Sequence, residues 1–151
     1  MSLRRVPGCP LCDAAGGHLV FQGDKFRLIR AEEEGFPAFY RVVWNDHVAE
    51  FSDLAPTDRV ACMDAVVRVE RVVREHLSPD KVNLAALGNV VPHLHWHVIA
   101  RFRWDSRFPA PVWAAAQRVA DPAGLARVEA MRPALEAALA ATLGSGNCCA
   151  S

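Results

Sequence analysis

Three histidines alternate with apolar residues in the segment His93-Leu94-His95-Trp96-His97. Successive side chains of a β-strand point to opposite faces, so this spacing places the three imidazoles on one face, about 7 Å apart. A neutral imidazole nitrogen can attack phosphorus and form a covalent intermediate that water then hydrolyses. Such a nucleophile needs its other ring nitrogen held by a backbone carbonyl or by a second imidazole. The pattern therefore predicts a nucleophilic site for chemistry at phosphorus.

The stretch 93–104 has the alternation of a half-buried strand. Its even positions are all apolar, and its odd positions carry the three histidines, Ile99, Arg101 and Arg103. We expect the apolar side chains to enter the core and the other face to present three imidazoles and two guanidiniums. That face is a candidate anion site in a chain whose formal net charge is zero.

The cysteines offer a second kind of chemistry. Cys9 and Cys12 have the C-x-x-C spacing of a zinc knuckle that takes two further ligands from elsewhere, and the alternative is a pair of reduced thiols. Cys62 lies in a helical pattern and is expected in the core. The ending 148–151 has the form of a prenylation box without basic residues upstream, so a frayed tail is the simpler interpretation. A different class of enzyme would use the three histidines themselves as ligands of a catalytic zinc.

Local patterns predict the elements that position these residues. Extended segments are expected at 18–21, 25–30, 39–44 and 82–87, the first two joined by a Gly-Asp turn. Apolar residues at steps of three and four predict a helix over 56–77. Asp53 or Thr57 is expected to cap this helix, and Ser78-Pro79-Asp80 to end it.

The composition fits one compact domain of 151 residues with 52% hydrophobic side chains. Most large apolar residues precede Ala110, so we expect the domain in 1–109 and an alanine-rich helical extension, 110–151, packed on it. Helices are expected at 112–120 and 125–143, the second interrupted at Pro133, with a flexible tail from about residue 144.

Charge and hydropathy exclude several classes of protein. The 17 basic and 17 acidic side chains balance, which removes the electrostatic footprint of a protein that binds duplex nucleic acid or an anionic membrane. No apolar run is long enough to span a membrane, and no secretory signal is visible. We therefore expect a cytoplasmic protein.

The segment 88–99, Gly-Asn-Val-Val-Pro-His-Leu-His-Trp-His-Val-Ile, resembles the histidine triad signature. The likeness extends to 42–48 and 51–54 and covers about residues 9 to 109. It implies an α+β fold with a five-stranded antiparallel sheet and a long helix, paired into a homodimer. It also implies cleavage of a purine nucleotide or dinucleotide derivative at the α-phosphorus, without an organic cofactor.

The resemblance also assigns roles to single residues. His95 would become nucleotidylated, and His93 and His97 would support its orientation and protonation. Asn83, Asn89 and Gly88 would bind substrate or hold the phosphate loop. Relatives with a structural zinc imply the ligand set Cys9, Cys12, His47 and His93.

Two departures from the family pattern bear on whether the protein turns over a nucleotide or only binds it. Val90 stands where many members have Ser or Thr, and valine cannot donate a hydrogen bond to a phosphate. The loop 85–89 is shorter than the usual glycine-rich version, so fewer backbone N–H groups can cradle the phosphate. A nucleotide-binding module with little turnover is therefore the alternative to a hydrolase or transferase.

Overall fold

The computed structural model describes residues 2–146, and its centre is one five-stranded antiparallel sheet. The strands are β1 (His18–Gln22), β2 (Phe26–Arg30), β3 (Phe39–Trp44), β4 (Lys81–Ala85) and β5 (His95–Arg101). They lie in the order β1-β2-β3-β5-β4, so β5 is an interior strand. The α+β class and the five-stranded antiparallel sheet implied by the resemblance are confirmed.

The strands lie close to their predicted positions, and the largest difference is at β5. This strand is shorter than the predicted 93–104, because the N–H groups of His93 and Leu94 donate to the carbonyls of Val91 and Val48 rather than along a strand ladder. At its other end the chain turns, and the Asp105 N–H donates to the Phe102 carbonyl at 2.9 Å. The Gly-Asp turn between β1 and β2 forms as expected.

The long helix α2 (Pro56–Leu77) has the predicted bounds, but its predicted cap is wrong. Ala55 occupies the capping position without a side-chain bond, and Pro56 follows it. Proline lacks one of the N–H groups that a cap would satisfy, so the helix can begin there without a polar side chain. Asp53 instead ends a short 3-10 helix, η1 (Phe51–Asp53). Ser78 ends α2 in the left-handed conformation, with φ at 46°.

The C-terminal segment differs most from its prediction. Helix α3 (Pro122–Gly144) is capped by Asp121, whose side chain accepts from the Ala123 and Gly124 N–H groups, and it continues through Pro133 without a break. Four buried side chains of α3 join the main core and offset the hydrogen bond that the proline removes. They are Val128, Leu135, Leu139 and Leu143. Residues 112–120 form turns instead of a helix.

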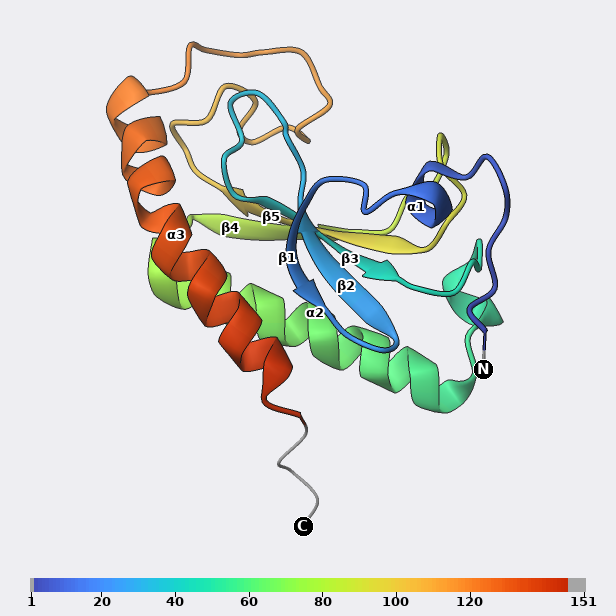
Figure 1. Ribbon diagram of the computed structural model, residues 1–151. Coiled ribbons are helices and arrows are strands. Elements are labelled where there is room, and N and C mark those ends of the chain that lie inside the picture. Colours follow the sequence, from blue (N-terminus) through green and yellow to red (C-terminus); the bar gives the residue numbers. More distant parts are fainter. Residues whose placement is uncertain (1, 147–151) are drawn as a thin grey trace.

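The sheet has a face that packs against the long helices and an opposite face that carries the candidate site residues. Figure 1 shows α2 below the sheet and α3 running from the upper left down past the edge of the sheet and across α2, whereas α1 (Pro10–Asp13) and the segment between β5 and α3 lie toward the upper side. Apolar side chains of β3 and β5 at Tyr40, Val42, Val98 and Ala100 face the helices and form the main core. The opposite face of β5 carries His95 and His97.

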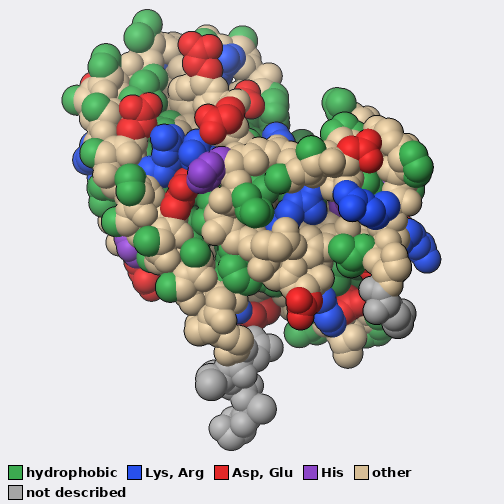
Figure 2. All heavy atoms as spheres, in the orientation of Figure 1, with side chains coloured by type: hydrophobic (Ala, Val, Ile, Leu, Met, Phe, Trp, Pro, Cys, Tyr) green, Lys and Arg blue, Asp and Glu red, His purple; other side chains and the backbone are tan. Residues whose placement is uncertain are grey.

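Side-chain charge is mixed on the surface of the molecule. Figure 2 shows acidic and basic side chains interspersed over the face drawn, in agreement with the zero net charge. Within residues 2–146, none of the helices combines the length and the apolar character that a membrane crossing needs. The division at residue 109 stays a prediction, and the ending 148–151, interpreted as a frayed tail rather than a prenylation box, lies outside the described residues.

Candidate active site and metal cluster

His95 opens β5 and is oriented by the backbone just before it. Its Nδ1 lies 2.6 Å from the His93 carbonyl oxygen, so Nδ1 carries the proton and donates it to that oxygen. The Nε2 atom then holds the free lone pair. Burial lowers the pKa of His95, against the effect of this hydrogen bond, and the positive charge of Arg41 lowers it further. His95 is therefore a neutral imidazole at pH 7 with a defined nucleophilic atom.

His97 lies beside His95, and the two rings meet edge to face with centroids 5.0 Å apart. Burial lowers the pKa of His97 to about 3, with further contributions from His95 and Arg41, so it is neutral as well. Its ring also contacts the edges of Phe39 and Trp113. Among the described residues its buried Nδ1 atom has no hydrogen-bond partner. An unsatisfied buried nitrogen beside His95 is a candidate contact for a ligand.

A cleft of about 420 Å³ opens over these two imidazoles. Gly88 and Asn89 form part of its wall, and the φ of Gly88 at 80° is a conformation that favours glycine. Val90 also lines the cleft, with 93% of its surface exposed. Asn83 does not line it, and its Oδ1 accepts from the Arg101 guanidinium at 2.7 Å.

The prediction that two guanidiniums lie beside the three imidazoles is wrong. Arg101 is 2% exposed, and its Nε donates to Asp105 Oδ2 at 2.8 Å, which neutralises its charge. Arg103 lies beyond the end of β5 on the surface, 3.5 Å from the carboxylate of Asp80. The reason is that the strand ends at Arg101 and the following turn places an acid against it.

Two cleft residues were absent from the sequence-based predictions. Arg41 on β3 pairs in register with His97 and lines the cleft. Its signal was visible as the one charged residue of an otherwise apolar strand, 39–44. Trp113 reaches the cleft from the segment that follows β5. Nothing in the local sequence of Trp113 indicated this position, because its place depends on how that segment folds back.

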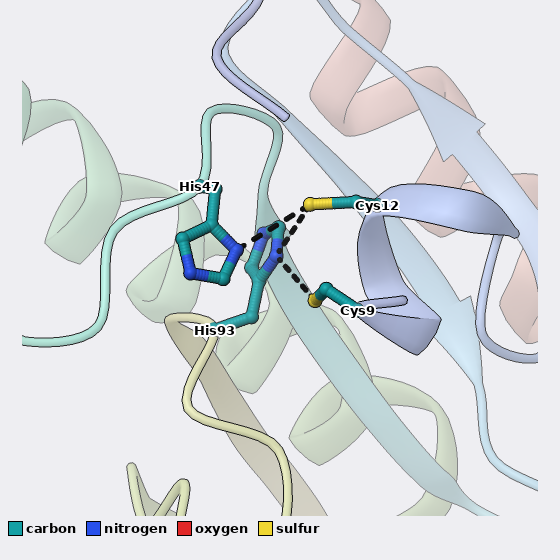
Figure 3. A group of neighbouring side chains, drawn as sticks. All are labelled: Cys9, Cys12, His47 and His93. Carbon is teal, nitrogen blue, oxygen red and sulfur yellow. Dashed lines mark hydrogen bonds between the residues drawn. The ribbon is translucent and has the colours of Figure 1, made fainter. Parts of the chain in front are cut away.

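His93, the third histidine, faces a different cluster (Figure 3). Its Nδ1 lies 3.5 Å from both Cys9 Sγ and Cys12 Sγ, and the Nδ1 of His47 lies 3.4 Å from Cys12 Sγ. The ligand atoms of these four residues all lie within 4.8 Å of one another, so they could hold a metal ion. The sequence-based ligand set is thus brought together from α1, the turn after β3 and the loop before β5.

The chemistry of this donor set fits zinc. His93 Nε2 donates to the Trp44 carbonyl at 2.6 Å, which leaves Nδ1 unprotonated and turned toward the sulfurs. Two thiolates and two neutral imidazoles are a frequent tetrahedral zinc set, and their two negative charges balance the ion. Arg27 steadies the knuckle, because its Nη2 donates to the carbonyls of Leu11 at 2.7 Å and Ala14 at 3.3 Å.

This fold and this row of imidazoles define the histidine triad class of α+β proteins. The chain belongs to that family, since the family model described as HIT domain matches residues 14–104. Membership implies a nucleotide-binding hydrolase or transferase. A comparison with curated protein sequences gives no match.

Solved structures of bacterial members share the fold. A histidine triad protein from Bradyrhizobium japonicum is 30% identical, with a TM-score of 0.64, over 79% of this chain and 90% of that one. One from Marinobacter aquaeolei VT8 is 26% identical, with a TM-score of 0.65, over 83% and 93%. A zinc-bound family protein from Mycobacterium smegmatis is 25% identical, with a TM-score of 0.60, over 93% and 98%.

Proposed function

We propose that this protein cleaves a nucleoside phosphate derivative at its α-phosphorus through a covalent nucleotidyl-His95 intermediate. The observation that carries the proposal is the hydrogen bond from His95 Nδ1 to the His93 carbonyl, which leaves Nε2 free to attack. A backbone carbonyl can only accept a hydrogen bond, so this contact fixes the tautomer of His95 with the proton on Nδ1. The substrate would be a dinucleoside polyphosphate, a phosphoramidate or an adenylate ester.

The reaction would proceed in two displacements. His95 Nε2 forms a bond to the α-phosphorus while the bond from phosphorus to the leaving group breaks, and the leaving group departs with that electron pair. Water then attacks the same phosphorus, the N–P bond breaks, and the nucleoside monophosphate and neutral His95 are released. His95 leaves as a neutral imidazole because its proton stays on Nδ1, so the proton lost by the water passes to solvent or to the released phosphate. A transferase would admit another acceptor in place of water.

The other site residues would support these steps. Gly88 and Asn89 on the cleft wall would bind the phosphate, and His97 would contact it or the leaving group through its unsatisfied ring. The role implied for Asn83 in binding substrate stays a prediction, and its side chain would have to serve the ligand while accepting from Arg101.

We further propose that Cys9, Cys12, His47 and His93 hold a structural zinc ion. The zinc would supply a cross-link between the N-terminus and the residue before β5, and no chemistry at phosphorus. Support comes from the converging donor atoms and from the zinc-bound Mycobacterium smegmatis relative. The rival assignment, a catalytic zinc on the triad, is disfavoured because His93 turns both of its nitrogens away from His95 and His97.

A mass-mapped adduct tests the proposed function directly. The protein is incubated with labelled adenosine and guanosine phosphoramidates, adenylate esters and dinucleoside polyphosphates, and modified peptides are sequenced. We expect one label on His95, absent in His95→Asn and present in the control His76→Asn, whose ring bonds within α2. Full turnover by His95→Asn would refute the proposal. Nucleotide binding without turnover or label would favour the binding module.

The homodimer implied by the resemblance remains part of the proposal. β4 is an edge strand of the sheet, and Leu84 on it is 41% exposed. Analytical ultracentrifugation measures the mass in solution, and a 16.5 kDa species at all concentrations would contradict a dimer.

A further inference from the structure

The strands carry four arginines, of which Arg27, Arg30 and Arg101 are buried and Arg41 is partly buried. The three buried arginines have protein partners. Arg101 pairs with Asp105, and Arg30 pairs with Glu136 at 2.7 Å. Arg27 donates to backbone carbonyls of the knuckle. Arg41 is the exception, because the hydrogen bonds and ion pairs found among residues 2–146 do not involve its side chain, and its Nε atom is buried without a partner.

Even partial removal of a guanidinium from water is costly, so a purely structural arginine would be expected to have an acid or carbonyls around it. Around Arg41 the groups that bear on its charge are few. Burial lowers the pKa of its guanidinium, and the distant carboxylate of Glu33 acts in the opposite direction. The Phe39 ring lies 5.5 Å from the guanidinium carbon. None of these supplies an oxygen acceptor, which is the group that a guanidinium binds when it is withdrawn from water.

The wall of the cleft gives Arg41 an electrostatic role. Of the side chains that line the cleft within the described residues, Arg41 is the only charged one, because both histidines there are neutral and no acid is among them. Arg41 and His97 occupy paired positions on β3 and β5, and His95 belongs to the next pair on the same face. An anion bound over His95 would therefore lie in the field of a single fixed cation.

We propose that Arg41 binds the non-bridging oxygens of the substrate's reacting phosphate and selects an anionic phosphate over a neutral group. The planar guanidinium matches two phosphate oxygens at once, and the same contact strengthens as negative charge develops on phosphorus during attack. The proposal rests on the proposed function for its chemistry, but it makes a claim about binding that is tested without turnover.

The test compares the affinities of AMP and adenosine by calorimetry in four proteins. Arg41→Met keeps the side-chain length without the charge, Arg41→Lys keeps the charge without the fork, and Arg103→Met is the matched surface control. We expect the wild type and Arg103→Met to favour AMP over adenosine by about ten- to a hundredfold, the range of a charge-assisted hydrogen bond. Arg41→Met should lose this preference with adenosine affinity unchanged, and Arg41→Lys should restore part of it.

Thermal unfolding separates a binding role from a structural one. Because Arg41 has no hydrogen-bond or ion-pair partner in the part of the chain that the structure describes, Arg41→Met should melt at the same or a higher temperature than the wild type, whereas removal of a structural arginine lowers it. Equal AMP preference in Arg41→Met and the wild type would overturn the proposal, as would the lack of any AMP preference in the wild type.

The His95 adduct keeps this inference distinct from the proposed function. A wild type that forms the adduct while Arg41→Met retains the AMP preference leaves the function standing and removes Arg41 from it. A wild type that forms no adduct but loses its AMP preference on Arg41→Met overturns the reaction and supports the anion site.

Discussion

The buried ion pair of Arg101 and Asp105 anchors the segment that brings Trp113 to the cleft. Asp105 is 1% exposed, and its Oδ1 accepts from the N–H groups of Arg107 at 2.9 Å and Phe108 at 2.7 Å. Burial alone would raise the pKa of Asp105, but the hydrogen bonds from Arg101 and the backbone hold it below its ordinary value. The carboxylate is therefore charged at neutral pH, and the turn after β5 depends on it.

Asp105→Asn is the perturbation that isolates this charge. Asparagine keeps the size and one acceptor oxygen, but it leaves Arg101 buried without a counter-ion and turns an N–H₂ group toward a donor. Breaking a buried pair by removing one partner costs about 3–5 kcal/mol. Because Asp105→Asn retains one acceptor oxygen, we expect its free energy of unfolding to fall by the lower value, about 3 kcal/mol. The double variant Arg101→Met, Asp105→Asn should lose less than the sum of the two single variants.

Urea unfolding followed by tryptophan fluorescence at pH 7 measures the change in the free energy of unfolding. Asp80→Asn is the control, because Asp80 pairs with Arg103 on the surface and should change that free energy by less than about 1 kcal/mol. The carboxylate's contribution is present above its ordinary pKa of 3.8 and is lost as the pH falls through the lower folded value. A loss at pH 7 no larger than that of Asp80→Asn would refute the reasoning.

Three further outcomes follow from the site. Plasma emission spectrometry should find about one zinc per chain in the purified protein and in Cys62→Ala, and none in Cys9→Ser; equal metal in all three would contradict the cluster. Burial lowers the pKa of His97 to about 3, so below pH 6.5 the unfolded chain binds a proton that the folded chain does not. The free energy of unfolding should therefore fall by about 2 kcal/mol more between pH 7 and 5 in the wild type than in His97→Gln. Urea titrations in which both proteins lose the same free energy of unfolding between these pH values would count against it. Trp113→Ala should weaken AMP binding by about two- to tenfold, the range of an aromatic contact, and unchanged calorimetric affinity would place Trp113 outside the ligand's reach.

Local periodicity was sufficient where an element's reasons are local. Both bounds of α2 and of β3 agree with the patterns at 56–77 and 39–44, since each run of apolar residues ends at residues that cannot continue it. Pro133 shows the limit of this reasoning. A proline is expected to interrupt a helix, yet Val128 before it and the buried leucines after it share the main core with α2 and hold α3 continuous.

Alternation also indicated which face of β5 carries the histidines, but it could not say what happens to charge on that face. Arg101 has the same parity as His95 and His97, and the structure neutralises it with an acid four residues further along. Arg41 comes from a strand distant in sequence and supplies the charge instead. Strand pairing, which no single segment encodes, decides which guanidinium reaches the cleft.

His93 connects the candidate metal site directly to His95, the proposed nucleophile. Its side chain is held by the Trp44 carbonyl on one nitrogen and faces the two sulfurs with the other, while its own carbonyl accepts from His95 Nδ1. A shift of His93 would therefore move the carbonyl that determines which nitrogen of His95 is free. On this geometry the proposed structural zinc would affect the proposed reaction without approaching phosphorus, by fixing the position of that carbonyl. Loss of the metal should accordingly lower kcat more than it changes the affinity for AMP.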